Sequence, residues 1–141
     1  MKREILFRGK RTDNGEWIYG NLIGDDAIVG EMAYFDDDYF ITTFWYKVNP
    51  ETVGQFTGVT DKNGIKVFEG DIVSISYSRA FFEKQIPSTI GVVRYLDCLP
   101  RFMIMGGVEP NCVAISSFCN TGEEWEVIGN IYDNPELLTK I

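Results

Sequence analysis

The chain of 141 residues carries a formal net charge of −8, contains no histidine, and is 45% hydrophobic with 14% aromatic residues. This composition is sufficient to fill a core and argues against a disordered chain. The missing histidine removes the commonest general base, the Ser-His and Cys-His nucleophile pairs and most catalytic zinc sites. The negative charge disfavours nucleic acid as a general partner, because it repels phosphate.

Turn residues divide the first part of the chain into short segments rich in β-branched and aromatic side chains, which favour strands. In chain order we predict strands at Ile5–Phe7, Trp17–Ile23, Ala27–Val29, Glu31–Phe35 and Tyr39–Val48. Asn49-Pro50 ends the last of these, because proline lacks a backbone donor and keeps its predecessor out of the helical region.

The central segment, residues 54–73, is predicted to be a hairpin. Asn63-Gly64 separates two short apolar runs, and this dipeptide favours a type I′ turn with positive φ at both central residues. Glu69-Gly70-Asp71 then indicates a bulge or corner. The frame Phe-x-Gly-x-x-x-x-Asn-Gly-x-x-aliphatic-aromatic begins both at Phe7 and at Phe56. It indicates either two hairpins of similar build or convergence on one turn type.

The C-terminal part continues the strand pattern. We predict strands at Asp71–Tyr77 and Glu124–Tyr132, and a pair of strands at Thr89–Asp97 and Arg101–Met105 around Leu99-Pro100. We also predict a mobile loop at Arg79–Ser88, with or without a helical turn, and either a strand or a helical turn at Val113–Phe118. Asn134-Pro135-Glu136 has the N-cap, N1 and first-turn residues of a short C-terminal helix. The predicted fold is mainly β, a hairpin-built small barrel or sandwich with SH3-like character in its C-terminal half. One domain spans residues 1–141, with two packed β subdomains at about 1–50 and 51–141 as the alternative.

Several ordered motifs carry a family resemblance over nearly the whole chain. They are REILFRGK at 3–10, DNGEWIYG at 13–20, TVGQFTG at 52–58, DKNG at 61–64, FEGDIV at 68–73 and VIGNIYDNPELL at 127–138. With these motifs the chain resembles the YopX family of phage and prophage proteins. The resemblance implies a bacteriophage or prophage origin and a β-rich fold, and it supplies no activity or catalytic residues.

One local pattern is a candidate partner contact, and its residues are Asp36, Asp37, Asp38, Phe44, Trp45 and Tyr46. In a strand Phe44 and Tyr46 face one side and Trp45 the other, so the second face is either buried between sheets or exposed as a contact patch. The three aspartates lack the alternating oxygen ligands of an EF-hand loop, which favours a solvated turn over a cation site. We assign no catalytic residue, metal or cofactor.

The favoured function is that of a non-enzymatic β module, encoded by a phage or prophage, that acts through protein–protein contacts or self-assembly. In a more specific version, the acidic protein offers carboxylates in place of phosphates to a nucleic-acid-binding host factor. The alternatives are a carboxylate-dependent hydrolase and a nucleic-acid-binding protein that uses the basic first strand, where Lys2, Arg3, Arg8, Lys10 and Arg11 lie.

We also predict a cytoplasmic homo-oligomer. The cysteines Cys98, Cys112 and Cys119 form no CxxC pair, and no signal peptide or bilayer-spanning apolar run is expected, which favours reduced thiols in a bacterial cytoplasm. The basic segment Lys2–Arg11 and the acidic segment Asp25–Asp38 carry opposite charge, and open strand edges favour pairing between copies.

Overall fold

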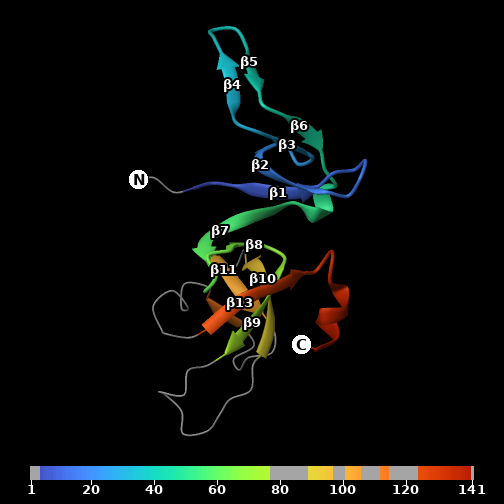
Figure 1. Cartoon of the computed structure of the whole chain (residues 1–141), viewed down its shortest axis with the longest axis vertical. Helices are drawn as coiled ribbons and strands as arrows, with labels where there is room; N and C mark the ends of the chain where they lie inside the picture. The colour runs from blue at the N-terminus through green and yellow to red at the C-terminus, as the bar shows by residue number, and fades with distance from the viewer. Residues whose placement is uncertain (1–3, 77–88, 97–100, 106–111, 115–123, 141) are drawn as a thin grey trace, which may run out of the picture. The chain divides into compact units, whose positions relative to one another are not determined.

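The computed structural model describes residues 4–76, 89–96, 101–105, 112–114 and 124–140 (Figure 1). The described chain is mainly β and divides into two compact units, Met1–Phe56 and Thr57–Ile141. The boundary falls within one strand rather than at residue 50. Whether the halves form one domain or two packed subdomains stays a prediction.

Unit 1 is an antiparallel sheet that carries a separate hairpin. Its elements are β1 (Phe7–Lys10), β2 (Trp17–Ile23), β3 (Ala27–Val29), β4 (Met32–Phe35), β5 (Phe40–Thr42), β6 (Trp45–Lys47), the 3-10 helix η1 (Pro50–Thr52) and the start of β7 (Gly54–Thr60). The strand order is β6-β3-β2-β1-β7, with β8 following β7 beyond the unit boundary, while β4 and β5 form a two-stranded sheet of their own.

The core of unit 1 is small and closely packed. Ile28, Val48 and Phe56 are buried, and Gly9 lies so close to Val48 that a Cβ on Gly9 would be 2.8 Å from Cγ2 of the valine. Thr52 fastens η1 to β1, because its Oγ1 accepts a hydrogen bond from the Lys10 amide at 2.9 Å. These contacts hold η1 and Val48 against β1.

Unit 2 is built on a second antiparallel sheet with the order β12-β11-β10-β9-β13. Its elements are β8 (Lys66–Phe68), β9 (Asp71–Ser76), β10 (Thr89–Leu96), β11 (Arg101–Met105), β12 (Cys112–Ala114), β13 (Glu124–Asn130) and the 3-10 helix η4 (Pro135–Lys140). The helix η4 occupies the segment in which the sequence predicts a short C-terminal helix. Apolar side chains from five strands form the core, namely Val67, Val73, Ile75, Val93, Ile104 and Trp125.

Two buried carboxylates hold the turns of unit 2. Asp61 accepts hydrogen bonds at Oδ1 from the amides of Asn63 and Ile65, each at 2.9 Å, and at Oδ2 from the amide of Val127 at 3.0 Å. Asp71, which is 2% exposed, accepts from the Phe68 amide at 2.8 Å and closes the corner predicted at residues 69–71. Both carboxylates thus accept hydrogen bonds from backbone amides.

The predicted type I′ turn at Asn63-Gly64 is wrong. Gly64 has φ of 79°, but no described non-glycine residue has positive φ, so Asn63 does not adopt the required conformation. The Gly64 amide donates to the carbonyl of Asp61 at 3.0 Å, and the Asp61 carboxylate holds the two amides on either side of Gly64. These bonds select a turn that needs only glycine in the left-handed region.

The two matched hairpin frames use their first glycines differently. Gly9 is required by close packing on Val48, whereas Gly58 has φ of 89° and open space where its Cβ would be. Gly15 and Gly64, at the second matched position, both have positive φ. The two hairpins are therefore alike in their turn glycines, and they differ in the packing around the first glycine.

Two other strand predictions need adjustment. The segment predicted as one strand at Tyr39–Val48 is two strands, β5 and β6, interrupted at Thr43-Phe44 where the chain passes from the hairpin to the main sheet. The predicted pairing around Leu99-Pro100 is confirmed, because β10 and β11 pair from Val92↔Met105 to Leu96↔Arg101. Within Val113–Phe118, residues 113 and 114 belong to a strand, and the remainder lies outside the described residues, as does the loop at 79–88.

Candidate contact surface

The hairpin β4–β5 leaves the main sheet of unit 1 and is here termed the arm, residues Met32–Thr42. Its register pairs Met32 with Thr42, Tyr34 with Ile41 and Phe35 with Phe40, with a bulge between Met32 and Tyr34. Figure 1 shows the arm extending from the end of unit 1 beyond β3 and β6. Among the described residues, each arm strand has one strand neighbour, so neither outer edge of this small sheet is paired with another described strand.

The arm exposes large apolar side chains on both faces. Six of them lie within residues 32–41 and are between 49% and 70% exposed: Met32, Tyr34, Phe35, Tyr39, Phe40 and Ile41. Adjacent strand residues point to opposite faces, so the pair Phe35–Phe40 lies on one face and the pair Tyr34–Ile41 on the other. The Tyr34 and Tyr39 rings are in contact, with centroids 5.7 Å apart. The arm is thus an aromatic surface without an apolar covering layer.

The tip of the arm is an ordered acidic turn. Asp36 accepts hydrogen bonds at Oδ1 from the amides of Asp38 and Tyr39, at 2.8 and 3.0 Å, and at Oδ2 from the Tyr34 hydroxyl at 3.2 Å. These bonds favour the ionised form, so the pKa of Asp36 is lowered, chiefly by the Asp38 and Tyr39 amides. All three aspartates are exposed. The turn therefore presents carboxylates at the end of an aromatic hairpin.

The attachment of the arm depends on Gly30. Its amide donates to the carbonyl of Phe44 at 2.9 Å, and the amide of Thr43 donates to the carbonyl of Glu31 at 2.9 Å. A Cβ on Gly30 would collide with Thr43 Oγ1 and with the Phe44 ring. Glycine is needed here because the two chain segments cross the junction in close contact. Beside this junction lies a groove of about 490 Å³, lined in part by Ile5, Tyr19 and Phe44.

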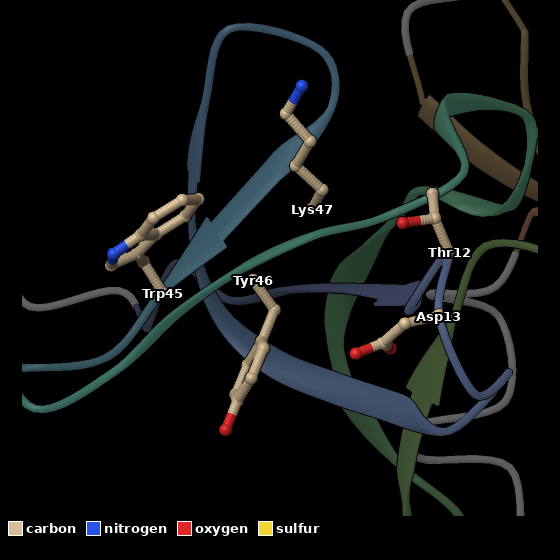
Figure 2. Close-up of a pocket in the computed structure, with 5 residues that line it drawn as sticks. All are labelled: Thr12, Asp13, Trp45, Tyr46 and Lys47. Atoms are coloured by element: carbon tan, nitrogen blue, oxygen red, sulfur yellow. The ribbon is translucent and has the colours of Figure 1, made fainter.

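The predicted aromatic run overlaps the start of β6, an edge strand of the described sheet. Phe44 and Tyr46 lie on one side with ring centroids 5.8 Å apart and are half-buried, while Trp45 is 65% exposed. Figure 2 shows Trp45 and Tyr46 leaving the strand in different directions beside a shallow pocket of about 240 Å³, which Thr12, Asp13 and Lys47 also line. The alternative in which both faces are buried is therefore wrong.

Described cations of the first strand are engaged within unit 1. Arg8 is buried, and its guanidinium carbon lies 4.6 Å from the centroid of the Trp17 ring. Arg11 lies 3.8 Å from the Tyr46 ring centroid and donates from Nε to Asp13 at 2.9 Å. This hydrogen bond raises the pKa of Arg11 and lowers the pKa of Asp13. These two guanidinium groups thus have structural contacts.

This chain is similar to known proteins both in sequence and in fold. The YopX protein family matches residues 6–139. The chain belongs to the YopX protein family. The crystal structure of protein EF1440 from Enterococcus faecalis is similar to this YopX protein with a TM-score of 0.63 at 22% identity, over 97% of this chain and 99% of that one. At this identity the similarity shows a shared fold. Among curated proteins, no sequence matches this one.

The sequence predicts part of this candidate surface. It singled out the three aspartates and the run 44–46, and the structure places the aspartates at the arm tip and the run at and beside β6. It missed the aromatic and aliphatic side chains of the arm itself, because alternating apolar residues in a strand ordinarily indicate a core face. The detectable signal was the position of Tyr34, Phe35, Tyr39 and Phe40 immediately around a triple aspartate.

The described residues contain neither a metal-binding cluster of side chains nor a membrane-spanning helix. No cluster of three or more Cys, Asp or Glu side chains there is arranged to hold a metal ion. No helix in the same part of the chain is long and apolar enough to cross a membrane.

Proposed function

We propose that this protein is a non-enzymatic β module that acts through protein–protein contacts, and that the arm is its contact surface. The observation that carries the proposal is the exposure of six large apolar side chains in one hairpin. At roughly 200 Å² per large side chain, half to two-thirds exposed, they present on the order of 700 Å², summed over both faces of the arm. Exposed apolar patches of more than a few hundred Å² generally mark interaction sites.

The energetics of the arm support this role. A two-stranded hairpin is marginally stable alone, and burial of its apolar faces is what ordinarily stabilises one. The arm's strands instead expose every residue except the half-buried Thr42. A partner that covers either face or pairs with an outer edge would supply the missing burial. Maintaining such a surface on a free chain carries an aggregation hazard, which favours a binding role for it.

The test compares a variant that loses two exposed apolar side chains of the arm with a control that loses one exposed apolar side chain elsewhere. The variant Phe35→Ser/Phe40→Ser removes the two phenylalanine rings on one face of the arm. The control Ile65→Ser removes an exposed apolar side chain of unit 2. Each immobilised protein is incubated with lysate of a bacterial host, and retained proteins are quantified by mass spectrometry. A partner kept by the wild type and by the control but lost by the arm variant supports the proposal. Equal retention by all three contradicts it.

We further propose that the protein self-associates as a homo-oligomer, through the terminal strand β6. Trp45 is 65% exposed on that strand, and within the described part of the chain β6 has one strand neighbour, β3. Pairing of β6 between copies would cover the edge and bury the indole together. A closed dimer or small ring is expected, since closed symmetry is commonest.

The two alternative functions receive less support. For a nucleic-acid-binding protein that uses the first strand, the cations Arg8 and Arg11 would have to leave aromatic and carboxylate contacts. A carboxylate-dependent hydrolase that used the buried acids Asp61 and Asp71 would have to release their backbone amides. Hydrolysis of a glycoside, phosphoester or peptide that is lost on changing one carboxylate would establish the enzyme.

Finer aspects of the fold and setting are also proposals. In unit 2 the consecutive strands β9, β10, β11 and β12 are antiparallel neighbours, and β13, the last strand in the chain, pairs with β9. This return of the last strand to the first supports SH3-like character for unit 2. Family membership supports a phage or prophage origin and, with it, the cytoplasm of a bacterial host as the site of action.

A further inference from the structure

We propose that the arm binds a protein whose groove holds single-stranded nucleic acid, and that it occupies this groove in place of the nucleic acid. The inference rests on the proposed function, since it names the class of partner for the same surface. Grooves of this class combine Lys and Arg side chains that follow the phosphates with aromatic side chains on which the bases stack.

The charge of the arm matches such a groove. The arm, residues 32–42, contains three acids at its tip and no Lys or Arg, and the nearest cations in the sequence are Arg11 and Lys47. The tip acids and Glu31 are exposed. A surface of this sign attracts a cationic groove at long range and is repelled by nucleic acid.

The rings of the arm supply the second half of the match. Tyr34 and Phe35 precede the triple aspartate and Tyr39 and Phe40 follow it, so exposed rings flank the carboxylates on both strands. Exposed rings stack on aromatic side chains and accept Arg guanidinium groups on their faces. The arm therefore presents planar apolar groups next to anions, which is the chemical pattern of a single strand.

The acidic tip is preorganised for this contact. The hydrogen bonds that Asp36 accepts from two amides and from the Tyr34 hydroxyl fix the turn. Asp37 and Asp38 are exposed on this fixed turn. A ligand that is already ordered loses less conformational entropy on binding.

The same charges disfavour a second arm as the occupant. Two arms in contact would bring two sets of tip aspartates and two copies of Glu31 together without an arm cation between them. Juxtaposed like charges oppose association. The guanidinium groups of Arg8 and Arg11 already have contacts within their own unit, so they are poorly placed to compensate.

The experiment measures displacement of a labelled oligothymidine from a purified bacterial OB-fold single-strand-binding protein, by fluorescence anisotropy. The full chain is the competitor, at concentrations up to about 100 μM, at which a weak competitor still registers. Asp37→Asn/Asp38→Asn removes two charges and keeps the Asp36 turn. The matched control Asp25→Asn/Asp26→Asn removes two charges from another exposed turn of unit 1. The ring variant is Phe35→Ser/Phe40→Ser.

The wild type is expected to displace the oligonucleotide, with a midpoint that rises with salt. Two exposed charge contacts predict a midpoint roughly tenfold higher for the tip variant and changed by about twofold or less for the control. The ring variant is expected to displace little of the oligonucleotide.

Absence of displacement by the wild type, or equal weakening by the tip variant and its control, overturns the inference. If the arm variant still loses a lysate partner that the Ile65→Ser control keeps, the proposed function survives that outcome. If arm and control retain the same proteins, both fail.

Discussion

At the scale of single residues, Asp61 joins its own turn to a distant strand of unit 2. It accepts hydrogen bonds from three backbone amides, one of which lies 66 residues away at Val127. We expect Asp61→Ala to lower the free energy of unfolding by about 2–3 kcal/mol, because a part-buried amide loses a charged acceptor and two turn amides lose theirs. Urea denaturation measures the loss. The exposed control Asp25→Ala should change stability by about 0.5 kcal/mol or less, and an equal effect of both would refute the role of Asp61.

Gly64 is a second residue at which substitutions should change stability. Its φ of 79° lies in the left-handed region, which a β-branched side chain resists and asparagine tolerates. We expect Gly64→Val to destabilise the protein by about 1–2 kcal/mol and Gly64→Asn by clearly less. The comparison of their denaturant midpoints isolates the backbone effect, since beyond the two neighbouring residues no atom lies within 4 Å of the position of a Cβ. Equal midpoints would show that the backbone of Gly64 is not left-handed.

These residues also show how far local sequence can predict a turn. The Asn63-Gly64 dipeptide correctly indicates a turn, and glycine correctly indicates positive φ. The turn type depends on Asp61, whose carboxylate is held partly by Val127. A contact between residues so distant in the chain is invisible to a pattern of neighbouring residues.

At the scale of elements, the arm is defined by its acidic turn, and its pH dependence follows from Asp36. The pKa of this carboxyl is lowered below the ordinary value of 3.8 because the amides of Asp38 and Tyr39 donate to the ionised form. A lowered pKa stabilises the turn above pH 3.8, and this stabilisation is lost as the pH falls through the lowered pKa. Carboxyl NMR titration should find the Asp36 midpoint below 3.8. A midpoint at or above it would mean that the turn is not closed in solution.

The arm marks the limit of element prediction from sequence. Strands were predictable at Glu31–Phe35 and from Tyr39 onward, because apolar and aromatic residues lie between turn residues. Their departure from the main sheet was not predictable. It depends on the close crossing of Gly30 with Thr43 and Phe44, a tertiary contact. Hydrophobicity also could not distinguish Phe40, which is 56% exposed, from Phe56, which is 6% exposed.

At the scale of the whole molecule, self-association through β6 is the expectation to test. Light scattering over a range of concentrations should show a mass above that of the 16.1 kDa chain. Trp45→Ala should shift the equilibrium toward the monomer, because the exposed indole would no longer be buried on association. A wild type that stays monomeric at tens of micromolar would exclude the homo-oligomer. A Trp45→Ala variant that keeps the wild-type mass would exclude β6 as its interface.

The central claim, that the arm is a protein contact surface, is tested most directly by photo-crosslinking in bacterial cells. A photo-reactive benzoylphenylalanine replaces Phe40 on the arm in one variant and Ile65 of unit 2 in the other, positions that are 56% and 50% exposed. We predict a discrete crosslinked adduct from position 40 and none of comparable yield from position 65. The mass of the adduct distinguishes a second copy of the chain from another protein. Equal labelling at both positions, or no adduct at position 40, would contradict the account.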